Sequence, residues 1–171
     1  MPKKKSKRQK GSDAHHSQVV LSPKDLKAAI LVYSGTQGVA LVDEVTEYFR
    51  KDADQFILKL GLVYFTAIGQ GIEYHQGFYG PLPIPSIKDH LSFVFTTAVP
   101  SRKQHDDRTN GESYVLTCLI CAKQQIPTHI DWPAIEAAFK AVFREISDAG
   151  EIDASIANAM KKAFLNGSKC V

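Results

Sequence analysis

Two apolar runs separated by a glycine-containing turn open the patterned part of the chain. The first run is Ala28–Tyr33 and the second is Val39–Val42, and the residues between them include Gly35 and Gly38. Apolar, β-branched runs joined in this way are typical of a β-hairpin, and glycine permits the positive φ angles of a tight turn. We therefore predict an antiparallel pair of strands over residues 28–42.

Between Asp52 and Gln70 the apolar positions take on the spacing of a helix. One face, with intervals of three and four residues, consists of Ile57, Leu60, Gly61, Tyr64 and Ile68. The opposite face is apolar as well, through Leu58, Leu62 and Phe65. A helix that is hydrophobic on both sides is buried on both sides, and in a small domain the second side needs another subunit or a covering loop. The pattern predicts a partner interface at Leu58, Leu62 and Phe65.

A proline-rich segment, residues 77–85, follows this predicted helix. Its prolines cannot donate hydrogen bonds inside a sheet, so we expect an extended surface segment or an edge strand. Residues 91–99 alternate in polarity, which predicts a strand that ends near Pro100. Residues 113–123 are almost all apolar, which predicts a central strand covered on both faces. The charged segment 102–111 between them is expected to be an exposed loop.

Two further helices are predicted at the C-terminal end. The first begins at Asp131 and ends at Gly150, with a core-facing stripe of Ile135, Phe139, Val142, Phe143 and Ile146. The second begins at Asp153, with apolar residues every four positions at Ile152, Ile156, Met160 and Phe164. The resulting order is two strands, a helix, an extended segment, two strands and two helices, which is an antiparallel sheet with helices of the α+β class.

The length and composition favour one domain with a polar N-terminal extension. A chain of 171 residues with 44% hydrophobic and 23% charged residues has the size and composition of a single globular domain. Residues 1–23 contain almost nothing to bury, so we expect a disordered basic arm there. We assign residues 24–166 to the folded domain and residues 167–171 to a C-terminal tail.

The positive charge of the chain is concentrated in this arm. Six basic residues and no acid lie in the first ten positions: Lys3, Lys4, Lys5, Lys7, Arg8 and Lys10. The remaining 15 basic residues (21 minus these 6) face 18 acidic ones, so the rest of the chain has a net charge of −3. Three binding roles stay open for the arm, namely a nuclear import signal, a contact with nucleic-acid phosphates, or attraction to anionic lipid, and the alternative to all three is a tail that only keeps the protein soluble. Sequence-specific recognition of nucleic acid is not expected, because the predicted domain has no basic stripe or aromatic platform.

Residue types that build catalytic and metal sites are present, but without the spacing that such sites need. Cys118 and Cys121 are three apart on a predicted strand, so they point to opposite faces and are expected to be buried thiols. The pair Asp106 and Asp107 lies in the charged loop. The histidines are dispersed, and surface or turn positions are expected for His15, His16, His75, His90, His105 and His129. We predict no catalytic, cofactor-binding or metal site, and no enzymatic activity.

Features of membrane-anchored or exported proteins are missing from the sequence. No apolar run approaches the roughly 18 residues needed to cross a bilayer, and the basic N-terminus lacks the apolar segment of a secretory signal. Three cysteines are too few for the disulfide framework of a secreted domain. Cys170 is second from the end rather than fourth, which does not suit prenylation. We expect a cytoplasmic protein, peripheral to membranes, with a nuclear location as the alternative.

The hairpin over residues 30–42, the helix after it, the Ile72-Glu73-Tyr74 segment and the two later strands resemble a longin or roadblock domain, a profilin-like α/β fold. The resemblance covers residues 28–165 and lies in element order and apolar pattern. It implies a five-stranded antiparallel sheet with one helix on one face and one or two on the other. A third strand is expected near the proline-rich segment, where the chain departs from the family pattern.

The resemblance also implies a function. Members of the group commonly dimerise and serve as platforms for small GTPases or as subunits of vesicle-trafficking and signalling complexes. We expect a non-enzymatic adaptor that pairs, as a homo- or heterodimer, through the first helix and binds partner proteins. A nuclear or nucleic-acid-associated accessory subunit is the alternative. A third hypothesis is an enzyme that binds a ligand between the sheet and a helix.

Overall fold

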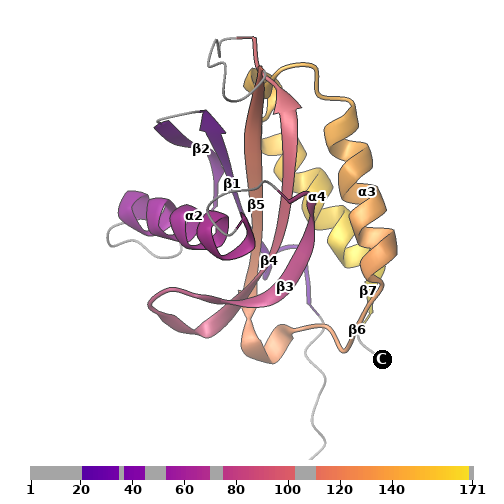
Figure 1. Ribbon diagram of the computed structural model, residues 1–171. Coiled ribbons are helices and arrows are strands. Elements are labelled where there is room, and N and C mark those ends of the chain that lie inside the picture. Colours follow the sequence, from indigo (N-terminus) through magenta and orange to yellow (C-terminus); the bar gives the residue numbers. More distant parts are fainter. Residues whose placement is uncertain (1–20, 35–36, 45–52, 70–74, 103–110, 170–171) are drawn as a thin grey trace, which may run out of the picture.

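The computed structural model (Figure 1) describes residues 21–34, 37–44, 53–69, 75–102 and 111–169. Several predictions fall outside these ranges. They concern the basic residues of the arm, the carboxylate pair at positions 106–107, the histidines at positions 15, 16 and 105, and Cys170.

The described chain is an antiparallel sheet with helices on both faces (Figure 1). The strands are β1 (Lys27–Ser34), β2 (Gln37–Asp43), β3 (Gly77–Ile84), β4 (Ile87–Pro100) and β5 (Glu112–Ala122), in the spatial order β2-β1-β5-β4-β3. The helices are α2 (Ala53–Gly69), α3 (Trp132–Arg144) and α4 (Ala154–Gly167). Two 3₁₀ turns, η1 (Lys123–Gln125) and η2 (Ala149–Glu151), and a small ladder of β6 (His129–Ile130) with β7 (Ser168–Lys169) complete it. The predicted α+β class and antiparallel sheet are confirmed.

The first two strands form the predicted hairpin. Ile30 pairs with Val42 and Val32 with Val39, and a bulge lies at Leu41, between the partners of Ile30 and Leu31. This ladder places β2 at one edge of the sheet. The prediction of a strand pair over residues 28–42 is confirmed.

The proline-rich segment forms the opposite edge. Residues 77–84 pair with β4 as strand β3, and the register shifts between Tyr79 and Leu82, around the prolines. An edge strand tolerates proline because one side of it has no ladder to join. The predicted edge strand is confirmed.

The central strand β5 separates two apolar clusters. Its residues alternate between the faces, so that Val115, Leu119 and Cys121 contact the side of α3 and α4 while Leu116, Cys118 and Ile120 contact the side of α2. Pairing with both β1 and β4 completes the burial of its backbone. The prediction of a central strand covered on both faces is confirmed.

Both C-terminal helices begin at aspartate caps. The Asp131 carboxylate accepts from the Ala134 amide and the Asp153 carboxylate from the Ser155 amide, which satisfies backbone donors that a helix N-terminus leaves without partners. The predicted end of α3 at Gly150 is wrong, because the helix stops at Arg144 and Gly150 belongs to η2. Asp148 accepts from the Gly150 amide in this separate turn, which follows the end of the helix.

Residues at both ends of the domain pack more closely than the terminal assignments predict. Leu21, which we placed in the arm, is 7% exposed and belongs to the cluster under α3 and α4. Gly167 ends α4, and its carbonyl accepts from the Asp131 amide, while Ser168 pairs with Ile130. The folded part of the chain therefore extends at least from residue 21 to residue 169.

None of the helices in the described ranges is both long and apolar enough to span a membrane.

Candidate interaction surfaces

The inner side of α2 is fixed to the sheet by apolar contacts and one buried polar group. Ile57, Leu60 and Tyr64 are at most 2% exposed, and Gly61 brings the helix so close to β1 that an added Cβ would lie 3.0 Å from Leu31 Cδ2. Ile68 packs against the same cluster. The predicted core-facing side of this helix is confirmed.

The buried polar group is the Tyr64 phenol. Its Oη donates to the carbonyl oxygen of Pro83 at 2.9 Å and hydrogen-bonds with Ser92 Oγ, which is also fully buried. Burial raises the pKa of this phenol, so it stays neutral. The network ties α2 to the β3–β4 hairpin, and its polar groups hydrogen-bond one another rather than an outside ligand.

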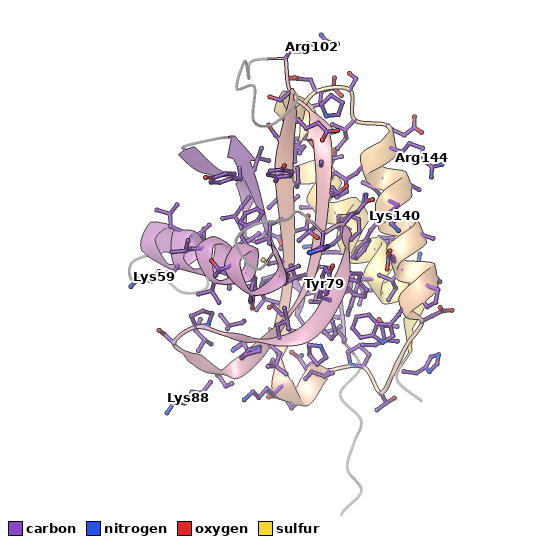
Figure 2. All side chains as sticks on the ribbon, viewed as in Figure 1. Lys59, Tyr79, Lys88, Arg102, Lys140 and Arg144 are labelled. Carbon is purple, nitrogen blue, oxygen red and sulfur yellow. The ribbon has the colours of Figure 1, made fainter. Side chains whose placement is uncertain are left out.

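The outer side of α2 exposes large apolar side chains. Leu58 is 54% and Leu62 69% exposed, and Val63, about 100° farther round the helix than Leu62, is 42% exposed. Leu58 and Leu62 are four residues apart and Phe65 follows three residues later, so the three form one ridge along the helix. We call Leu58, Leu62 and Phe65 the α2 ridge. Lys59 is the charged residue of this helix whose exposure is described, and it projects from α2 into solvent (Figure 2).

Phe65 differs from its two companions. It is half-buried, packs against the α2-side cluster and has its ring centroid 5.7 Å from that of Tyr33 on β1. Our expectation that Phe65 faces outward like the leucines is wrong in this respect, because the ring tilts down onto the sheet. Tyr33 is itself 40% exposed and extends the apolar surface onto β1.

These side chains are notable as a group. Among the side chains whose burial the structure describes, the exposed large hydrophobics are Tyr33, Leu58, Leu62 and Val63, and they lie on α2 or on the adjoining strand β1. Isolated apolar residues are common on any surface, whereas a gathering on one face is typical of a binding site. The structure thus places two of the three predicted interface residues on an open apolar face and the third at its base.

The cysteines behave as the strand geometry predicts. Cys118 lies in the α2-side cluster and Cys121 in the α3 and α4 cluster, both unpaired and fully buried. Burial raises the pKa of both thiols, to about 11 for Cys121, so neither is a thiolate near neutral pH. The expectation of buried thiols on opposite faces is confirmed.

Histidines are mostly at exposed positions where they are described. His75 and His129 are exposed, but His90 is only 8% exposed, so the surface prediction is wrong for His90. Its Nδ1 lies 3.0 Å from Asp89 Oδ1 at the start of β4. Within the described ranges no group of three His, Cys, Asp or Glu side chains could hold a metal ion.

A groove along the C-terminal half of α4 is a second surface feature, which the sequence analysis missed. It encloses about 600 Å³ and is lined by Leu21, Pro23, Pro127, Asn158, Lys161, Lys162, Leu165, Asn166 and Ser168. The lining residues come from three separate parts of the chain. Spacing within α4 alone marks Asn158, Lys162 and Leu165 as one helix face, but the proline walls become neighbours only in the folded chain.

One wall of the groove is held by an ion pair. Lys161 Nζ lies 2.7 and 2.9 Å from the two carboxylate oxygens of Glu44, and the same carboxylate accepts from the Ala28 amide at 2.9 Å. The Lys161 side chain is only 12% exposed. This contact links the end of β2 to α4 across the edge of the sheet.

Comparisons with known proteins identify no relative: no family model, no curated protein and no solved structure matches the chain.

Proposed function

We propose that this protein is a non-enzymatic adaptor that forms a homodimer through the α2 ridge and presents the rest of its surface to partner proteins. The observation that carries the proposal is the clustering of exposed apolar side chains on α2 and the adjoining end of β1. Two nearly uncharged faces of this kind complement one another, and their burial follows from the hydrophobic effect.

The arrangement of the ridge suits pairing of two copies. In a twofold dimer the same patch meets itself, so each leucine position contributes one buried side chain from each protomer. Complete burial of a leucine side chain contributes about 1.5–3 kcal/mol, and Leu62 keeps more than two-thirds of its surface available for this purpose. Two such leucines in each protomer, with the exposed ring of Tyr33 against Phe65 of the same ridge, provide the apolar centre of an interface.

The longin or roadblock resemblance supplies the biological setting of the proposal. The structural support for this setting is an antiparallel sheet in the order β2-β1-β5-β4-β3 with α2 on one face and α3 and α4 on the other. Under this proposal the dimer acts as a platform for a small GTPase or as a subunit of a vesicle-trafficking or signalling complex. The basic arm adds attraction to an anionic membrane surface.

Sedimentation velocity on the full chain and on Leu62→Asp tests the pairing. Replacing both copies of Leu62 removes roughly 2 kcal/mol of apolar burial from each protomer, so the affinity should fall about a thousandfold. The variant should sediment as a folded monomer with an unchanged circular dichroism spectrum, because Leu62 is exposed in the single chain.

Ala141→Asp is the matched control. Ala141 is exposed on α3, on the other face of the sheet, so the same new carboxylate there should leave the dimer intact. A Leu62→Asp protein with the wild-type sedimentation coefficient would contradict pairing through the ridge. An unfolded Leu62→Asp protein would contradict it as well, since the leucine would then belong to the core.

A further inference from the structure

The α4 groove has the chemistry of an anion-binding surface with an apolar floor. Its lining contains two lysines, two asparagines and a serine, but no acidic residue. Leu21, Pro23, Pro127 and Leu165 provide the apolar part. A ligand that fits both parts must carry negative charge next to a hydrocarbon surface.

The two lysines of the lining contribute differently. The Glu44 carboxylate already neutralises Lys161, which holds the groove wall rather than a ligand. Lys162 is exposed at the rim of the groove. Lys24 follows Pro23 of the lining and is exposed as well. Lys162 is therefore the exposed cation of the lining, and Lys24 is the exposed cation that follows the lining residue Pro23 in the sequence.

The basic arm joins the domain at this groove. Leu21 lines the groove, and the last basic residue of the arm, Lys10, is eleven positions before it. A fully extended chain spans at most about 3.6 Å per residue, so Lys10 lies within roughly 40 Å of Leu21, and Lys3, eighteen positions before Leu21, lies within roughly 65 Å of it.

The lining distinguishes between two kinds of anionic partner. Proteins that bind single-stranded nucleic acid combine positive charge with aromatic rings on which bases stack, and the groove contains no aromatic residue. A lipid bilayer presents phosphate and carboxylate groups directly above hydrocarbon, which matches lysines beside leucine and proline.

We propose that the α4 groove, with Lys162 in its lining and the exposed Lys24 next to Pro23 of the lining, docks this protein on an anionic phospholipid bilayer. The inference rests on the membrane part of the proposed function and adds a folded surface to the arm. Because α4 and α2 cover opposite faces of the sheet (Figure 1), docking through the groove leaves the α2 ridge available for pairing.

Co-sedimentation of the full chain with vesicles tests the proposal. Wild-type protein should bind vesicles of phosphatidylcholine and phosphatidylserine, bind vesicles of phosphatidylcholine alone far less, and lose affinity as salt rises. A basic residue near an anionic surface contributes about 1 kcal/mol, so Lys24→Gln/Lys162→Gln should weaken binding about thirtyfold. Both residues are exposed, so the folded state and the sedimentation coefficient should not change.

Lys140→Gln/Arg144→Gln is the matched control. It removes the same charge from α3, where both side chains project away from the sheet (Figure 2), and should bind vesicles like the wild type. Unchanged binding by Lys24→Gln/Lys162→Gln, together with lost binding after neutralising the six basic residues of the arm, would overturn the inference and leave the proposed function standing. Absence of vesicle binding by the wild type would overturn both membrane roles. Binding to oligonucleotides in place of vesicles would show the other class of partner.

Discussion

Replacing Tyr64 with phenylalanine removes a single oxygen atom from the contact between α2 and the β3–β4 hairpin. That oxygen bonds to the Pro83 carbonyl and to Ser92 Oγ, and both Tyr64 and Ser92 are at most 2% exposed. The lost hydrogen bond costs about 1 kcal/mol, and leaving the buried Ser92 hydroxyl with only its 3.5 Å contact to the Leu82 carbonyl costs about 1 kcal/mol more. We expect Tyr64→Phe to lower the free energy of unfolding by about 2 kcal/mol, which corresponds to roughly 4–8 °C in Tm for a domain of this size.

Urea unfolding followed by circular dichroism measures this loss, at one fixed protein concentration because pairing couples stability to concentration. The slope m should stay constant, so that only the midpoint moves. The Tyr64→Phe/Ser92→Ala double variant provides the control, since removal of both partners leaves fewer orphaned groups than the sum of the single changes predicts. A loss below about 0.5 kcal/mol for Tyr64→Phe, or strictly additive effects, would refute the role assigned to this network.

Two further predictions concern the C-terminal helices. Gly167→Ala should lower the free energy of unfolding in urea by about 1–3 kcal/mol, because the new Cβ would lie 2.3 Å from Ile135 Cγ1. Adding Ile135→Val should not restore all of the lost stability, because valine keeps a γ carbon. An unchanged free energy of unfolding for Gly167→Ala would show that α3 and α4 separate freely. Asp153→Ala should destabilise α4 at neutral pH. The hydrogen bonds from Ser155 hold the pKa of the Asp153 carboxyl below its usual range. Its stabilising effect is therefore complete above about pH 4 and is lost as pH falls through the lowered pKa, so the thermal melting temperatures of variant and wild type should converge in acid; a constant difference would contradict the cap.

The sequence predicts the elements of this fold because their local signals agree with their final positions. Asp131 and Asp153 cap helices where the apolar stripes begin, and the apolar run of β5 becomes the central strand. The prolines of β3 predict an edge strand, because proline has no amide hydrogen to donate and an edge strand needs donors on only one side.

The sequence predictions are wrong where contacts between distant parts of the chain decide the local structure. Gly150 resembles a helix end, but the carboxylate of Asp148 stabilises a separate turn after α3 has already stopped. Phe65 has the spacing of an outward position, yet its ring is large enough to reach Tyr33 at the sheet. Leu21 follows a polar segment and still packs in the core, because the helices on that face leave room for one more apolar side chain.

The α2 ridge and the α4 groove also differ in how far the sequence predicts them. The α2 ridge is visible in the sequence, since one helix contains all of its residues in a regular pattern. The α4 groove is not, because Leu21, Pro127 and Leu165 come together only through the β6–β7 ladder and the packing of the N-terminal segment on α4.

Sedimentation equilibrium of the wild-type chain tests the pairing through α2 most directly. Over a range from about 1 to about 100 µM, in which interfaces of moderate affinity assemble, the mass should rise from that of one chain to that of two and then stay constant. A mass equal to one chain at every concentration would mean that Leu58 and Leu62 remain in contact with water, and the homodimer would have to be abandoned.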